Sequence, residues 1–286
     1  MERLSHAISK FREHFGAWAR VVLIVGVLSL LFFVAGGGVS HKGKWRIDQI
    51  NISGTDTATA DTVRSLVRQK LEGNYFFVYA RNNSFLYPKS ETEDMLLETF
   101  PRIKKVEVMR TDDHTIMVTI AEREPYALWC GEKYRPELSS FPLCYFIDSD
   151  GFVFDHSPTF SRGVYVVVYS KLIAKNEGEA LRGNIPQARF AVADGFSKLA
   201  REKIGKPFQI ELKDDGEQSV TLMSSVEYPF LADVDVRFKD EAKPEALVKN
   251  IITAIPAQFP GNIALKKKLL YIDMRFGNKV IFGFEN

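Results

Sequence analysis

The sequence has few of the side chains from which catalytic and metal centres are usually built. Its 286 residues include two cysteines and five histidines, and no histidine lies at a recognisable metal-ligand spacing from a cysteine. It contains no Gly-x-Ser-x-Gly turn, no Walker phosphate loop and no His-Glu-x-x-His helix. We therefore predict no catalytic residue, no metal site, no cofactor and no small-molecule substrate, and we interpret the chain as a non-enzyme.

The chain also lacks an excess of charge of either sign. Lysine and arginine number 38, aspartate and glutamate number 36, and the formal net charge is +2. A nucleic-acid-binding protein usually carries a clear basic footprint. We therefore expect no nucleic-acid partner.

Charged residues are absent from one long segment, VVLIVGVLSLLFFVAGGGV, which covers residues 21–39. As a helix, this segment is about long enough to cross a hydrocarbon core of roughly 30 Å. The preceding residues 1–20 carry four basic residues and two glutamates, and Trp18 lies where an interfacial aromatic would anchor the helix. We predict a cytoplasmic tail over 1–20, a single transmembrane helix in the lipid bilayer over 21–39, and a C-terminal part outside the cytoplasm.

Two features leave other interpretations of this segment open. Lys42, Lys44 and Arg46 follow it and nearly cancel the charge bias, and the small residues of AGGG could serve signal-peptide cleavage. A cleaved signal peptide and a buried core helix are the alternatives to a membrane anchor. Gly36 to Gly38 also suit a hinge, but no phosphate-binding helix follows them, so they do not indicate a nucleotide site.

The segment VEVMRTDDHTIMVTI predicts a hairpin with one apolar face. Val106 and Val108 alternate with polar or flexible residues, and Val118 and Ile120 do the same further on. If both sets face one core, Val108 lies opposite Val118 and Val106 lies opposite Ile120. This register leaves TDDHT, residues 111–115, as a five-residue connection.

The residues before this hairpin predict one strand and two helices. WRIDQINISG, residues 45–54, reads as a strand. A second helix is predicted to begin near Ser90, because Ser90 and Glu93 have the spacing of a capping box, and to end before Pro101. The order strand, helix, helix, strand, strand predicts a two-layer domain over residues 45–124. The first helix has one apolar stripe, formed by Val63, Leu66, Val67 and Leu71.

An aromatic stretch, YFFVYARNNSFLYP, lies between the two helices and begins at Tyr75. It has no clean periodicity. Its rings either cover the helices or form a contact surface, and we favour the first interpretation.

The remaining residues, 125–286, predict a second, β-rich domain with two helices. CYFIDSDGFVFD reads as a hairpin, and VYVVVY reads as a buried strand. Amphipathic patterns predict helices over about 187–204 and 244–255. Further strands are expected in PFQIELK, QSVTLMS, DVDVRF and KLLYIDMRFGNKVIFGF. The predicted fold class is α+β, with the single N-terminal transmembrane helix ahead of both domains.

The two cysteines, Cys130 and Cys144, bracket a short segment. Outside the cytoplasm, a disulfide that closes such a loop contributes roughly 3 kcal/mol in the chain-entropy model. We therefore predict a Cys130–Cys144 disulfide.

In this order, several segments resemble the FtsQ/DivIB family of bacterial cell-division proteins. The segments are FPRIKKVEVMR, IMVTIAEREPYALW, FIDSDGFVF and YIDMRFGNKVIF. The family's strand-end pattern is matched by Glu122, Arg123, Pro125, Ala127 and Trp129. Residues from about 156 to 185 match poorly, and the segment between the cysteines looks like an insertion.

The resemblance implies a POTRA domain over 45–124 and a family-type β domain over 125–286. It further implies a non-enzymatic scaffold of the divisome, located in the cytoplasmic membrane at the division septum. The scaffold would bind FtsB/DivIC-like and FtsL-like partners outside the cytoplasm and link division-site assembly to septal peptidoglycan synthesis. The expected mechanism is pairing of an exposed edge strand with a partner strand.

Carried over by position, the family's partner-binding strand falls on residues 271–284. For Phe276 and Phe284, ordinary packing on a sheet face is the alternative. The partner-binding residues that the resemblance implies are Tyr271, Arg275, Phe276, Lys279, Ile281 and Phe284.

Two other functions compete with this interpretation. A POTRA-containing docking or chaperone module of a secretion or assembly system would share the first domain, but would be expected to carry repeated units or a membrane barrel. A membrane-anchored hydrolase is the enzyme alternative.

Overall fold

The structure is a computed structural model that describes residues 2–55, 59–134, 143–173, 179–224, 227–260 and 267–285. For residues 2–17 and 224 it describes the backbone. The chain divides into two compact units, Met1–Glu122 and Arg123–Asn286. Each unit has its own hydrophobic core.

The first helix, α1 (Glu2–Ser40), runs without a break through the predicted tail and span. Within it, Trp18–Ser40 has a mean hydropathy of 2.5, and only 6% of its most apolar stretch is buried in the protein. A core helix would be mostly buried, so that alternative does not fit. By length and composition, α1 could anchor the chain in a membrane.

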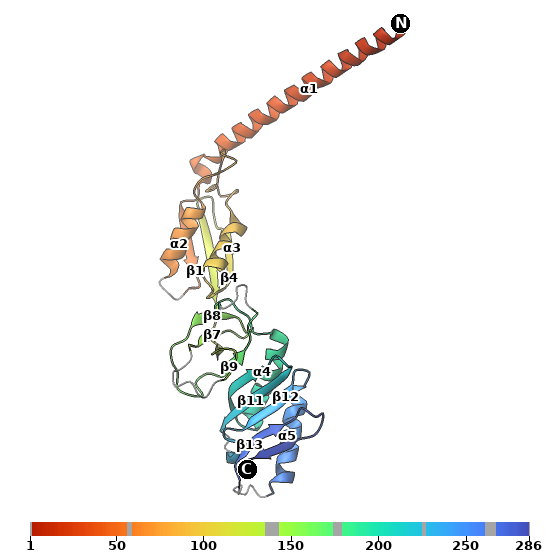
Figure 1. Cartoon of the computed structure of the whole chain (residues 1–286). Helices are drawn as coiled ribbons and strands as arrows, with labels where there is room; N and C mark the ends of the chain where they lie inside the picture. The colour runs from red at the N-terminus through yellow and green to blue at the C-terminus, as the bar shows by residue number, and fades with distance from the viewer. Residues whose placement is uncertain are drawn as a thin grey trace. The chain divides into compact units, whose positions relative to one another are not determined.

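The rest of the first unit is a three-stranded sheet packed against two helices (Figure 1). The sheet order is β1-β5-β4, with β1 parallel and β4 antiparallel to β5. The predicted order strand, helix, helix, strand, strand is therefore confirmed, and a short β2–β3 hairpin lies between the helices. The elements are a 3-10 turn (Gly43–Trp45), β1 (Gln49–Ser53), α2 (Thr59–Lys70), β2 (Asn74–Tyr75), β3 (Tyr79–Ala80), α3 (Lys89–Thr99), β4 (Ile103–Arg110) and β5 (Thr115–Glu122).

The predicted hairpin register is confirmed. Val108 pairs with Val118, and Val106 pairs with Ile120. All four side chains are buried in the core of the first unit, which the helices complete with Val63, Val67 and Leu96. The register follows because a slip of one residue would turn the apolar set toward solvent.

The predicted capping box of the second helix is wrong. α3 begins at Lys89 with Pro88 as its N-cap, and no side chain caps it. Glu93 does not cap the backbone at the helix start; its Oε1 lies 3.8 Å from Nζ of Lys89 and accepts a hydrogen bond from the backbone N–H of Val108 in β4 at 2.7 Å. The predicted end before Pro101 agrees with the helix end at Thr99.

The second unit is built on a nine-stranded sheet in the described residues, with the order β14-β13-β12-β11-β10-β9-β6-β7-β8. Its strands are β6 (Ala127–Trp129), β7 (Tyr145–Ile147), β8 (Val153–His156), β9 (Val167–Ser170), β10 (Lys206–Leu212), β11 (Glu217–Ser224), β12 (Asp235–Lys239), β13 (Leu269–Asp273) and β14 (Ile281–Phe284). A 3-10 turn (Pro229–Leu231) lies between β11 and β12.

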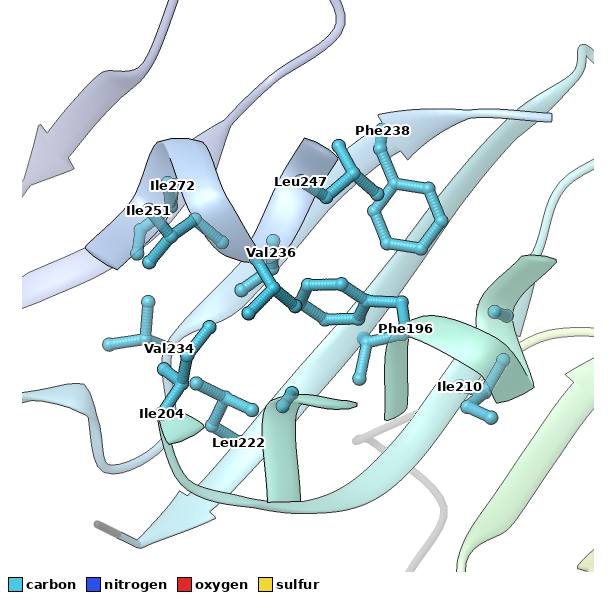
Figure 2. Packing of buried hydrophobic residues seen from close by; sticks show 14 of the residues in the cluster. Phe196, Ile204, Ile210, Leu222, Val234, Val236, Phe238, Leu247, Ile251 and Ile272 are labelled. Atoms are coloured by element: carbon cyan, nitrogen blue, oxygen red, sulfur yellow. The ribbon is translucent and has the colours of Figure 1, made fainter. Parts of the chain in front are cut away.

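Two helices, α4 (Gln187–Lys203) and α5 (Pro244–Gln258), pack against this sheet and against each other. Figure 2 shows the ring of Phe196 from α4 beside Phe238 from β12, with centroids 5.2 Å apart. Ile251 from α5 and Ile272 from β13 extend the same core. A β-rich second domain with two helices is the architecture that the sequence predicted.

Candidate functional site

The C-terminal strand, β14, is the last strand of the large sheet. Its inner side pairs with β13 in antiparallel register, from Asp273 opposite Ile281 to Leu269 opposite Phe284. On its outer side, no segment that the structure describes pairs with it. An unpaired edge presents backbone donors and acceptors to a partner strand.

The opposite end of the same sheet is closed by the chain itself. At β8, the N–H of Val153 donates to the carbonyl of Gly183 at 2.9 Å, and the N–H of Arg182 donates back to the carbonyl of Val153 at 2.8 Å. These bonds occupy the outer groups of Val153. β14 is therefore the more accessible edge of this sheet.

Three of the predicted partner-binding residues face solvent beside this edge. Phe276 has 57% of its surface exposed, and Ile281 and Lys279 are exposed as well. Phe276 and Lys279 lie on the turn between β13 and β14, and Ile281 lies on β14. In the turn, Gly277 adopts a positive φ of 68°, and the N–H of Lys279 donates to the carbonyl of Phe276 at 3.4 Å. A positive φ is a conformation that glycine adopts without strain.

Arg275 is held by an internal ion network. Its guanidinium lies 2.6 Å from the carboxylate of Asp273 and 2.5 Å from that of Glu217. Asp273 is 5% exposed, and the hydrogen bonds from Arg275 lower the pKa of its carboxyl below the ordinary value of 3.8. Arg275 thus anchors the end of β13 and the turn after it, with part of its surface left exposed.

Tyr271 and Phe284 lie against the protein rather than free at the edge. A Cβ on Gly283 would overlap the ring of Tyr271, so the glycine lets this ring lie across β14. The guanidinium of Arg237 lies 4.2 Å from the centroid of the same ring. The ring of Phe284 packs edge-on against Phe259 at 6.2 Å, so its role is partly structural.

Three residues beside the edge were not among the predicted site residues. Leu270 is exposed on β13, and Lys267 and Lys268 are exposed just before that strand. The N–H of Glu285 donates to the carbonyl of Lys268 at 2.9 Å, which places this lysine beside the end of β14. The run of lysines was visible in the sequence, but its proximity to β14 depends on the strand pairing.

The predicted disulfide is confirmed. Cys130 and Cys144 are bonded, with their Cα atoms 4.3 Å apart. The bond joins the end of β6 to the start of β7 and closes the segment between them. Residues 135–142 of that segment lie outside the described residues.

The interpretation that the aromatic stretch covers the core fails for its most exposed rings. Phe76 and Phe77 are 78% and 98% exposed, and Phe85 is 63% exposed. Tyr87, by contrast, packs against the first core. Part of this stretch, Phe76, Phe77, Phe85 and Leu86, therefore presents apolar surface to its surroundings.

One cavity of about 400 Å³ in the second unit bears on the enzyme alternative. Among its lining residues, Tyr126 donates a hydrogen bond to Asp194, and Lys198 lies 2.7 Å from the same carboxylate. Burial and Asp194 raise the pKa of Tyr126, and the hydrogen bond to Asp194 raises the pKa of Lys198. Neither group is prepared to take up a proton near neutral pH as a general base.

Within the described residues, no three histidine, cysteine, aspartate or glutamate side chains form a group that could hold a metal ion. Comparison of the sequence with models of known protein families and with curated proteins found no match.

Proposed function

We propose that this protein is a non-enzymatic, membrane-anchored scaffold of the bacterial division complex that binds its partners by strand pairing at β14. The observation that carries the proposal is the open outer edge of β14, next to the exposed Phe276 and Ile281. Backbone pairing would supply affinity, and these side chains would select the partner strand.

The proposed anchor is the apolar part of α1. At 1.5 Å per residue, its 23 residues extend about 34 Å, which is enough to cross a bilayer core. The excess of basic residues before it favours a cytoplasmic N-terminus. Both units then lie outside the cytoplasm, where the Cys130–Cys144 disulfide is stable.

The assignment to division rests on the resemblance to the FtsQ/DivIB family, in which residues 45–124 correspond to the POTRA domain. The order of elements in the first unit and the position of the C-terminal strand support this correspondence. By that resemblance, the partners are FtsB/DivIC-like and FtsL-like membrane proteins, and the site of action is the division septum.

The charges beside the edge indicate what the partner strand carries. Lys267, Lys268 and Lys279 are all exposed near β14 or its turn. Acidic side chains on the partner would complement them, while apolar side chains would contact Ile281 and Phe276.

Photo-crosslinking in native membranes tests the proposal. A photo-reactive amino acid replaces Phe276 in the full-length protein, and in a matched control it replaces Phe85. Both rings are exposed, and each has an arginine beside it, Arg275 and Arg110 respectively. The expected result is capture of a small single-pass coiled-coil protein from position 276 and not from position 85. If position 276 of the folded protein forms adducts only within its own chain, the docking edge lies elsewhere.

A further inference from the structure

Two glycines of α1 are contact points for the β2–β3 hairpin. A Cβ on Gly37 would overlap the side chain of Val78, and a Cβ on Gly36 would lie 2.8 Å from the hydroxyl of Tyr79. Gly38, the next residue, has open space around it. The glycines are therefore not a free hinge in this structure, because the hairpin packs closely against two of them.

Hydrogen bonds hold the hairpin at this position. The hydroxyl of Tyr79 donates to the carbonyl of Phe33 at 3.0 Å, and the two rings meet edge to face at 5.1 Å. Nearer the helix end, the N–H of Ala80 donates to Oγ of Ser40 at 3.1 Å. The hairpin thus lies along the last two turns of α1.

These contacts reach back into the apolar part of α1. Phe33 lies seven residues before Ser40, which is about 10 Å along a helix. If the apolar part spans a bilayer, Phe33 lies within about 10 Å of the outer end of the span, a depth that the apolar side of an interfacial segment reaches. A hairpin that touches Phe33 would reach the same depth.

The tip of the hairpin carries two strongly exposed phenylalanines, Phe76 and Phe77. Phe76 and Phe77 have positive φ angles of 48° and 64°, and they directly precede Val78, which contacts α1. Non-glycine residues rarely adopt positive φ, and two in succession are costly in a loop. The conformation holds both rings away from the protein, with 78% and 98% of their surfaces exposed.

The residues that follow α1 suit the same boundary. Lys42 and Lys44 are exposed, and the ammonium of Lys44 lies 5.7 Å from the centroid of the half-buried Trp45 ring. Tryptophan is enriched at membrane interfaces, and lysines attract anionic headgroups.

We propose that the β2–β3 hairpin is a membrane-interface anchor, in which Phe76 and Phe77 insert into the lipid at the outer end of α1. The proposal rests on the proposed membrane span of α1. It goes beyond that function by assigning the aromatic tip a lipid partner, which would fix the orientation of the first unit's sheet to the bilayer surface.

Spin labelling of the full-length protein in vesicles of phosphatidylethanolamine and phosphatidylglycerol tests this. Because both native cysteines are in the disulfide, a label reacts with the introduced cysteine of Phe77→Cys, Phe76→Cys, Leu30→Cys or, as the water-exposed reference in the second unit, Phe276→Cys. Relaxation by oxygen reports lipid exposure, and relaxation by a polar nickel complex reports water exposure. Leu30, near the middle of the apolar part, tests the span itself.

The expected result is high oxygen accessibility at positions 76 and 77, with nickel accessibility about ten-fold lower than at position 276, because polar solutes are excluded from the apolar phase. Nickel accessibility equal to that at position 276, with position 30 protected, would overturn the inserted tip and leave the span intact. Low accessibility to both reagents at the tip would show that protein, from the same or a second copy of the chain, covers the tip, and would reject the lipid. Water exposure at Leu30 would reject the span and the tip together.

The two neighbouring glycines provide a matched pair of second-site variants. Gly37→Val would push the hairpin off α1, so nickel accessibility at a label on position 77 should rise several-fold. Gly38→Val adds the same side chain where there is open space and should leave the label unchanged. Equal effects of the two variants would show that hairpin packing on α1 does not set the depth of the tip.

Discussion

The outer edges of β4 and β14 differ in what lies beside them. At β4, the carboxylate of Glu93 accepts the N–H of Val108 at 2.7 Å, so an outward donor is already occupied. At β14, no segment that the structure describes takes that place. Both strands end a sheet, so position in the sheet does not by itself make an edge available. One side chain from a neighbouring helix can block pairing with a partner.

The neighbouring helices explain the difference. α3 precedes β4 directly, and Glu93 on its first turns reaches across to the strand. α5 precedes β13 and directs Leu247, Ile251 and Ile255 into the core on one face of the sheet. Thus α3 supplies a polar group to the edge of its sheet, whereas α5 supplies apolar side chains to the face of its sheet.

The largest expected effect on stability is at the β14 edge, where the ion network of Arg275 holds the preceding turn. Arg275→Ala should lower the free energy of unfolding by about 3 kcal/mol, because the buried carboxylate of Asp273 loses its cation. Urea unfolding of the full-length protein in detergent at neutral pH, followed by circular dichroism, measures it. Lys279→Ala, on the exposed part of the same turn, should change stability by less than about 0.5 kcal/mol. Equal stability of the two variants would show that the ion network does not hold this turn.

The next largest effect is at the β4 edge, where removal of Glu93 should open the strand to pairing. Glu93→Ala should cost the first unit about 2 kcal/mol, because a hydrogen bond to a charged group is lost and Val108 N–H has no acceptor. The freed edge should also increase self-association, measured by sedimentation at rising protein concentration. Asp94→Ala removes the adjacent exposed carboxylate and serves as the control. Self-association no greater than that of the control would mean that Glu93 does not block the edge.

A smaller effect is the dependence of stability on pH that Asp273, beside the β14 turn, should contribute. Arg275 lowers the pKa of Asp273, so the folded state binds this proton less readily than the unfolded state. The associated stability is present above the ordinary pKa of 3.8 and is lost as the pH falls through the lower folded value. Urea midpoints of the wild type should therefore fall more steeply below about pH 4 than those of Asp273→Asn. Parallel curves would exclude this carboxyl as a source of acid sensitivity.

The smallest effect on stability tests whether the exposed ring serves only binding. Phe276→Ala should change the free energy of unfolding by less than about 0.5 kcal/mol, because the side chain is exposed. It should nevertheless weaken partner capture about ten-fold if the ring is a main contact. Phe284→Ala should show the opposite pattern in stability, because that ring packs on Phe259. A large loss of stability in Phe276→Ala would assign it to the core instead.

Parts of the site were predictable because they depend on spacing along the chain. Parity aligned Val106 and Val108 with Ile120 and Val118, and the short separation of Cys130 and Cys144 allowed their disulfide. Other parts were not predictable. Ser90 and Glu93 have the spacing of a capping box, but Glu93 bonds to a strand that is distant in sequence.

The predicted partner-binding residues show the same division. Phe276 and Phe284 are both phenylalanines near the C-terminus, and the sequence pattern does not distinguish them. The fold exposes the first on a turn and packs the second on Phe259. Arg275 was likewise a candidate contact, and only the pairing of distant strands brought Glu217 beside it.

Local patterns along the chain were enough to predict the apolar length of α1, the register of the β4–β5 hairpin and the disulfide, because hydrophobic run length, parity and loop size are local quantities. The folded structure was needed to show which sheet edge is open, which aromatic rings are exposed and why a side chain at positions 36 and 37 would meet the hairpin. Those properties depend on which distant segments fill the space beside a residue, and packing of the whole unit sets that.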